Sequence, residues 1–203
     1  MTDIIENTGA PEENTSPAPE GKNAKKEKQP MTFKRFYKEW ILPFGLEILA
    51  LFLIVKFVFF VPIVPSGSME PTIAERSALI ALRVHDLEKL QRGDIVVFTA
   101  QTPELEGTTL IKRLIGLPGD HVEIDENGTV TINGEAQQES YVVYQYAIPS
   151  TFDVPEGHYL FMGDNRANSL DSRYWSYPYV SAEAIQGKAV FTLFPFSNFG
   201  KLE

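Results

Sequence analysis

The chain has 203 residues, enough for one domain with an appendage but not for two full domains. It contains no cysteine, which excludes disulfides, thiolate nucleophiles and cysteine-ligated zinc, and its three histidines form no HExxH zinc motif. The formal net charge of −9 argues against nucleic acid as the main partner, because phosphate binding needs concentrated Lys and Arg.

The charge is unevenly distributed along the chain. Residues 1–30 carry a net charge of −2, residues 31–61 carry +2 and residues 62–203 carry −9. Residues 1–30 contain no aromatic residue and cannot bury enough apolar surface to offset the entropy lost on ordering. We therefore expect a disordered cytoplasmic tail over 1–30, a basic juxtamembrane segment with a transmembrane anchor over 31–61, and a folded domain over 62–203.

An almost continuous apolar stretch occupies residues 41–61, where 17 of 21 residues are apolar. As a helix it covers about 31 Å, close to the roughly 30 Å hydrocarbon core of a bilayer. Seven bases precede it and few follow it, so the positive-inside rule predicts a cytoplasmic N-terminus and an extracytoplasmic domain. Its length and the lack of a small-x-small site after it favour a retained single-pass anchor over a cleavable signal peptide.

The segment after the anchor reads Val-Pro-Ser-Gly-Ser-Met-Glu-Pro-Thr at 64–72. Two prolines bracket Ser66 and Ser68 and leave this stretch few conformations. Such rigidity suits a catalytic nucleophile, because a displacement of about 1 Å lowers the rate. The same residues fit a plain turn between anchor and domain, so the segment alone does not decide between the two.

Short β-branched and aromatic runs, separated by turn signals, follow through the rest of the chain. The Asn127-Gly128 pair lies between alternating residues and is a strong hairpin signal. Residues 180–186 could form one short helix. The sequence thus predicts a mainly β domain, a sandwich or distorted barrel, on a single N-terminal transmembrane helix. The expected strands are 79–84, 94–99, 110–115, 121–124, 129–132, 141–146, 158–162 and 188–194.

Two adjacent bases, Lys112 and Arg113, lie inside the predicted strand 110–115. Both faces of that strand are apolar, so alternation does not indicate which base is buried. Arg stays protonated, whereas burial can lower the pKa of a lysine from its ordinary value of about 10.4 and make the amine a general base. An edge strand whose bases discourage aggregation would explain the pair as well.

A dense polar loop, residues 163–173, follows the predicted strand 158–162 and holds two Asp, two Arg, two Asn and two Ser. Such loops are often only turns with surface ion pairs, but this density also suits side chains that orient a reactive group. The histidines are weak candidates for a Ser–His–Asp triad, and the chain has no GxSxG, P-loop, GxGxxG or Asp-Thr-Gly-like motif. A Ser nucleophile with a Lys base remains as the activated-nucleophile arrangement.

Four motifs occur in order behind the anchor: Pro-Ser-Gly-Ser-Met-Glu-Pro-Thr at 65–72, Arg-Gly-Asp-Ile-Val-Val-Phe at 92–98, Ile-Lys-Arg through Gly-Leu-Pro-Gly-Asp at 111–120, and Gly-Asp-Asn-Arg through Asp-Ser-Arg at 163–173. Together they resemble bacterial type I signal peptidases, over about residues 31–203. The resemblance implies a mainly β serine endopeptidase without metal or organic cofactor. Such an enzyme removes signal peptides from exported preproteins after small residues of the Ala-x-Ala type, through an acyl-enzyme intermediate.

The resemblance also implies roles for individual residues. Ser68 matches the nucleophile and Lys112 the general base, while the Ser66 hydroxyl and the Ser68 backbone N–H match the oxyanion hole. Ser169 matches the serine that holds the lysine. Ala167 departs from the family pattern, in which Asp is common. The matching supporting network is Arg113, Asp164, Arg166, Asp171 and Arg173, and the residues expected to line the substrate pockets are Val64, Met69, Ile73, Leu110 and Ile111.

The expected partners are preprotein substrates and the phospholipid of a bacterial plasma membrane, and the resemblance leaves room for association with the secretion machinery. We also expect Phe196 and Phe199 to contact the bilayer surface. Two other functions compete: a self-cleaving repressor of the same fold, and a tethered domain that binds exported chains without cutting them. The anchor argues against the first, and the presence of both Ser68 and Lys112 in matching motifs argues against the second.

Overall fold

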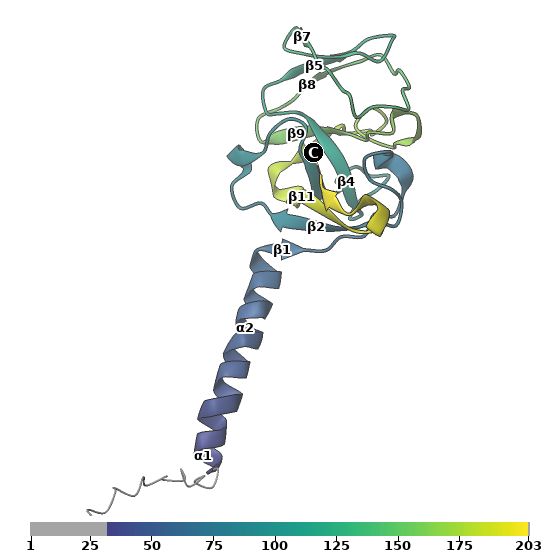
Figure 1. Cartoon of the computed structure of the whole chain (residues 1–203). Helices are drawn as coiled ribbons and strands as arrows, with labels where there is room; N and C mark the ends of the chain where they lie inside the picture. The colour runs from purple at the N-terminus through teal and green to yellow at the C-terminus, as the bar shows by residue number, and fades with distance from the viewer. Residues whose placement is uncertain (1–31, 203) are drawn as a thin grey trace, which may run out of the picture. The chain divides into compact units, whose positions relative to one another are not determined.

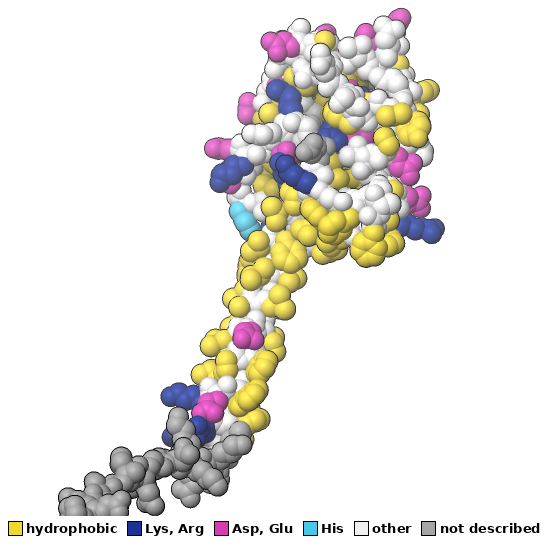
Figure 2. All heavy atoms as spheres, viewed as in Figure 1, with side chains coloured by type: hydrophobic (Ala, Val, Ile, Leu, Met, Phe, Trp, Pro, Cys, Tyr) yellow, Lys and Arg dark blue, Asp and Glu magenta, His cyan; other side chains and the backbone are white. Residues whose placement is uncertain are grey.

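A computed structural model describes residues 32–202 of the chain. These begin with an apolar helix, Phe33–Phe57, made of α1 (Phe33–Phe36), a π-helical turn (Tyr37–Ile41) and α2 (Leu42–Phe57) (Figure 1). Hydrophobic side chains cover this helix and none is buried (Figure 2). Over residues 32–202 it is the one helix long and apolar enough to cross a membrane. The predicted tail over 1–30 lies outside the described residues.

The helix starts before the predicted span 41–61 and stops short of its end, at Phe57. The chain then becomes extended, and Phe59–Phe60 (β1) pairs with Leu82 and Ala81. The backbone N–H of Arg83 donates to the Val58 carbonyl at 2.9 Å. These sheet hydrogen bonds satisfy backbone groups that would otherwise bond within a longer helix. The helix can therefore end at Phe57 although the apolar run continues beyond it.

Most of the strands form one antiparallel sheet of eight (Figure 1). Its neighbouring strands are, in spatial order, β1, β2 (Ala78–Arg83), β11 (Ile185–Phe194), β3 (Ile95–Thr99), β4 (Thr109–Gly116), β9 (His158–Met162) and β10 (Tyr179–Ser181), with β12 (Gly200–Lys201) paired to β11. A second, four-stranded antiparallel sheet has the order β7 (Glu135–Ala136), β6 (Val130–Ile132), β5 (His121–Ile124) and β8 (Ser150–Asp153). The prediction of a mainly β domain with one N-terminal apolar helix is confirmed.

Three buried apolar clusters hold the sheets together. The first packs side chains of the 64–73 segment against β2, β3 and β4. The second is centred on Phe98 and Phe161, whose rings stack with centroids 4.5 Å apart. The third joins the small sheet to Ile115 of β4 and Leu160 of β9. Each fully buried large aliphatic or aromatic side chain stabilises the fold by about 1.5–3 kcal/mol.

Two of the predicted elements are wrong. Residues 141–146 form no strand, because β8 pairs with the free side of β5 and the 141–146 segment instead lies against the polar loop 163–173, where the Ala167 N–H donates to the Tyr144 carbonyl at 3.0 Å. Residues 180–186 form no α-helix: β10 pairs with β9, a short 3-10 turn (Ala182–Ala184) follows, and β11 begins at Ile185.

Candidate active site

Ser68 lies in a tight 3-10 turn, Gly67–Met69, that follows an extended Ser66. The Met69 side chain is fully buried in the first apolar cluster and anchors the turn. Asn165 of the polar loop holds it from the other side: its backbone N–H donates to the Ser68 carbonyl at 3.1 Å, and its side-chain Nδ2 donates to the Gly67 carbonyl at 3.2 Å. The turn that carries Ser68 is therefore fixed on two sides.

Lys112 lies in the middle of β4, opposite Val96 of β3, and its residue is only 4% exposed. Its Nζ is in hydrogen-bond contact with Ser68 Oγ. Burial lowers the pKa of Lys112 to about 8, while the negative charges of Asp171 and Asp164 oppose that shift and the Arg173 charge adds to it. At a pH near 8 a substantial fraction of this amine is neutral and able to accept a proton from the hydroxyl it contacts.

The end of β9 brings the polar loop to this pair. Met162 lies opposite Arg113, so the following residue, Gly163, reaches the Ser68 turn. A Cβ on Gly163 would overlap the Ser68 carbonyl oxygen and Ser169 Oγ, so this position requires glycine. Ser169 Oγ is buried and makes no hydrogen bond within residues 32–202, and its predicted role in holding the lysine stays a prediction.

Arg113 and Asp164 form a buried, two-pronged ion pair, in which Nε and Nη2 donate to the two carboxylate oxygens at 2.8 and 2.7 Å. Arg113 also donates to the Gly93 carbonyl at 2.7 Å, and the Thr72 hydroxyl donates to Asp164 at 2.5 Å. The guanidinium carbon lies 3.9 Å from the centre of the Tyr141 ring. This one pair thus ties together all four motifs, which are far apart in the sequence.

The other supporting residues close the polar loop on itself. Asp171 accepts a hydrogen bond from the Gly163 N–H at 3.0 Å and two from the Arg173 guanidinium at 2.8 and 2.9 Å. Arg166 donates from Nε to the Gly163 carbonyl at 3.0 Å and from Nη2 to Glu139 at 2.6 Å. All of the predicted supporting residues other than Ser169 therefore lie in one hydrogen-bonded network around Gly163 and Asp164. Their roles in catalysis stay predictions.

Ser66 is exposed beside Ser68, and its hydroxyl donates to Ser68 Oγ at 3.5 Å, which is long for a hydrogen bond. The structure also groups four of the five predicted substrate-contacting side chains. Val64, Met69, Ile73 and Ile111 pack in the first apolar cluster, whereas the half-buried Leu110 packs against the second. That these side chains bind substrate stays a prediction.

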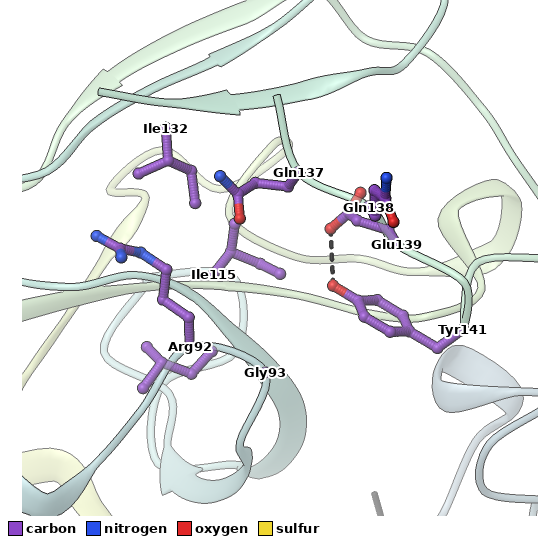
Figure 3. Close-up of a pocket in the computed structure, with 9 residues that line it drawn as sticks. Arg92, Gly93, Ile115, Ile132, Gln137, Gln138, Glu139 and Tyr141 are labelled. Carbon is purple, nitrogen blue, oxygen red and sulfur yellow. Dashed lines mark hydrogen bonds between the residues drawn. The ribbon is translucent and has the colours of Figure 1, made fainter. Parts of the chain in front are cut away.

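Four further residues contribute to the site without having been assigned a role from the sequence. Thr72 and Asn165 lie inside motifs, so their position was a usable signal. Nothing in the sequence pointed to Glu139 and Tyr141, because the pattern at 141–146 indicates a strand. Tyr141 begins that predicted strand and Glu139 lies just before it. The Tyr141 hydroxyl donates to Glu139 at 2.8 Å, and both line a cavity of about 250 Å³ beside β4 (Figure 3).

No group of three or more His, Asp or Glu side chains within residues 32–202 could hold a metal ion. What the site offers instead is a serine hydroxyl on a fixed turn, in contact with a buried amine whose pKa is lowered. This chemistry is typical of serine hydrolases that use lysine as the base.

Comparison with known proteins agrees with that class. The sequence model of the family described as "Signal peptidase, peptidase S26" matches residues 37–194. The chain therefore belongs to the signal peptidase family, peptidase S26, whose members are serine peptidases and hence hydrolases.

Two relatives at least 34% identical to the chain over most of their length support the assignment. The chain is 38% identical to "Probable signal peptidase I-1" of Synechocystis sp. over 179 residues, 83% of this chain and 88% of the relative. It is 34% identical to "Signal peptidase IB" of Staphylococcus aureus over 189 residues, 82% of this chain and 94% of the relative. A third match, "Probable signal peptidase I-2" of Synechocystis sp., is 38% identical, but the chain spans less than two thirds of its length, 65%. The crystal structure of a signal peptidase I from Enterococcus faecalis matches 49% of this chain and 96% of its own, at 36% identity and a TM-score of 0.43.

Proposed function

We propose that this chain is a membrane-anchored signal peptidase I that cleaves N-terminal signal peptides from exported preproteins after small residues, with Ser68 as nucleophile and Lys112 as general base. The contact between Lys112 Nζ and Ser68 Oγ inside a buried site carries this proposal. Membership of the signal peptidase family supports the substrate class.

The proposed reaction proceeds in two halves. Neutral Lys112 takes the proton of the Ser68 hydroxyl as Oγ attacks the scissile carbonyl carbon. The Ser66 hydroxyl and the Ser68 N–H donate to the oxyanion of the tetrahedral intermediate. The Lys112 ammonium then returns the proton to the leaving amine, which departs and leaves an acyl-enzyme. Water, deprotonated by the same amine, attacks the ester carbonyl. The bond between that carbonyl carbon and Ser68 Oγ breaks, Oγ takes the proton back from Lys112, and the signal peptide leaves with a new C-terminal carboxyl group.

A pH profile tests the state of the base. Because the pKa of Lys112 is lowered to about 8, the reactive neutral amine becomes scarcer below that pH. We expect kcat/KM for a signal-peptide substrate to rise about tenfold per pH unit between pH 6 and 8 and to level off above about 8. Initial rates with a fluorogenic peptide would measure this, with circular dichroism as a control for folding at each pH. If kcat/KM instead rose with a midpoint at or below pH 6, the base would be a different group.

The preference for small residues has a structural rationale. Val64, Met69, Ile73 and Ile111 lie next to the Ser68 turn and are at most 6% exposed, so they leave only shallow depressions for substrate side chains. The substrate is proposed to bind as an extended strand, which sends alternate side chains, P1 and P3, toward this floor.

Substituted preproteins test that preference. Replacing Ala by Leu at P1 or at P3 should lower kcat/KM at least about tenfold, because the larger side chain would strain a packed floor. The same replacement at P2, which points away, is the matched control and should leave kcat/KM within about twofold. Mass spectrometry of the products would locate the cleaved bond. Equal tolerance of Leu at all three positions would contradict this preference.

Membrane attachment through the Phe33–Phe57 helix, with the N-terminus in the cytoplasm and the domain outside, completes the proposal. A patch of exposed apolar side chains on the domain supports contact with lipid. Ile63 and Phe194 both pair with Ala78 of β2, and Phe194 and Phe196 lie with ring centroids 5.9 Å apart. Figure 2 shows hydrophobic side chains gathered on this part of the domain, near β2 and the C-terminal strands of Figure 1. Its exposed members are Val61, Ile63, Phe194, Phe196 and Phe199.

A further inference from the structure

The segment 139–146, which forms no strand, contacts all three arginines of the candidate site. Arg113 lies on β4 and binds Asp164 of the polar loop, whereas Arg166 and Arg173 lie in that loop. The contacts are Glu139 Oε1 to Arg166 Nη2 at 2.6 Å, the Tyr141 ring centre to the Arg113 guanidinium carbon at 3.9 Å, and the Tyr146 carbonyl oxygen to Arg173 Nη1 at 3.1 Å. A segment that lies between β7 and β8 in the chain is thus fastened to the polar loop 163–173 at two places and to β4 at one.

Glu139 supplies the one ionic contact among these. Its side chain is 10% exposed, and a single carboxylate oxygen accepts hydrogen bonds from Arg166 and from the Tyr141 hydroxyl (Figure 3). Burial raises the pKa of Tyr141, so its hydroxyl keeps the proton that it donates. The Arg166 side chain is only 2% exposed, and a guanidinium buried to that degree must be neutralised by a partner. Glu139 is therefore required for Arg166 to stay in its buried position.

Arg166 transmits this constraint to the nucleophile. Its Nε donates to the Gly163 carbonyl at 3.0 Å. Gly163 has no free space on its Cα, which faces the Ser68 carbonyl oxygen. A shift of Gly163 would therefore move Ser68 relative to Lys112, and displacements of about 1 Å at a nucleophile can lower the rate by up to about 100-fold.

We infer that Glu139 is a positioning residue for peptide cleavage, which acts through Arg166 and Gly163 on Ser68. The inference rests on the proposed function, because it assigns Ser68 to the chemical step. Glu139 makes no contact with Ser68 or Lys112 in this structure, so its effect should fall on kcat rather than on substrate binding.

The test compares Glu139→Gln with a matched control in the full-length enzyme. Gln has nearly the same shape and leaves the cavity of Figure 3 unchanged, but it removes the charge. Asp94→Asn is the control, because Asp94 is also 10% exposed and forms an ion pair with Lys188 at 2.5 Å outside the Arg166 network. We expect Glu139→Gln to lower kcat about tenfold with KM within about twofold, and Asp94→Asn to leave kcat within about twofold. Unchanged kcat in Glu139→Gln, or an equal loss in both variants, would overturn the inference.

A double-mutant cycle asks whether Glu139 acts through Arg166. Once Arg166→Met has removed the guanidinium, adding Glu139→Gln should lower kcat less than about twofold further. A full additional tenfold loss would mean that Glu139 acts by another route. If Glu139→Gln does not fold, as judged by circular dichroism, Tyr141→Phe replaces it: loss of one hydrogen bond to Glu139 should lower kcat about threefold, and no loss would overturn the inference. Failure of the proposed function would appear separately, as wild-type enzyme without activity or as Ser68→Ala with full activity.

Discussion

Ser68→Ala and Lys112→Met should each lower kcat for preprotein cleavage by at least about 1,000-fold. The first removes the oxygen proposed to attack, and the second removes the amine in contact with it. When two residues act as one unit, removing either one loses most of the rate. Processing of a purified preprotein, followed by gel and mass spectrometry, measures the loss. Circular dichroism of each variant establishes that the fold is retained.

Lys112→Arg is the sharper variant, because it keeps the positive charge and about the same length. Arg stays protonated at every accessible pH, so it cannot accept the Ser68 proton. We expect this variant to be as inactive as Lys112→Met across the pH range of the wild-type profile. Substantial activity of Lys112→Arg would show that the lysine does not act as a neutral base and contributes only charge.

Asp164→Asn should destabilise the fold by about 3–5 kcal/mol, because it removes the carboxylate charge that pairs with the buried Arg113 guanidinium. Both side chains of this pair are at most 2% exposed, so water cannot replace the lost partner. Chemical denaturation of the full chain in detergent measures the change in the free energy of unfolding. Activity should fall as well, since Asp164 also holds Thr72 at the end of the Ser68 segment.

Asp94→Asn serves as the control for this loss too. Its partner, Lys188, is 39% exposed, so water can solvate the ammonium after the substitution and the expected loss is only about 0–1 kcal/mol. A loss below about 1 kcal/mol in Asp164→Asn would contradict the structural role given to the Arg113–Asp164 pair.

The parts of the fold that were predictable are those with a local cause. Strands His121–Ile124 and His158–Met162 end where the sequence predicts, because turn residues border alternating or continuous apolar runs. The tight turn at Ser68 follows from the prolines and glycine around it. The proximity of Ser68 and Lys112, which lie 44 residues apart, was predictable only from the resemblance to a known family.

The parts that were missed depend on the competition for sheet edges. Residues 141–146 have the β-branched and aromatic character of a strand, but β6 and β8 already occupy the two sides of β5, so β5 cannot pair with them. The segment packs over Arg113 and Arg166 instead, which is how Glu139 and Tyr141 reach the candidate site. Local β-propensity does not show which of two segments pairs with a given strand edge. Two-residue strands such as Phe59–Phe60 were missed for another reason, because they are too short to show any periodicity.

Burial of Lys112 also couples the stability of the fold to alkaline pH. In the unfolded chain the amine returns to water and to its ordinary pKa of 10.5, so between about pH 8 and 10.5 the unfolded chain binds a proton that the folded chain does not. Stability rises with pH wherever the unfolded state binds more protons. The contribution of Lys112 to the free energy of unfolding is thus most unfavourable below about pH 8. It becomes less unfavourable between about pH 8 and 10.5, and it no longer changes above about pH 10.5. The desolvation that lowers the pKa of this amine therefore destabilises the folded enzyme at neutral pH, and the apolar clusters around the site must offset that cost.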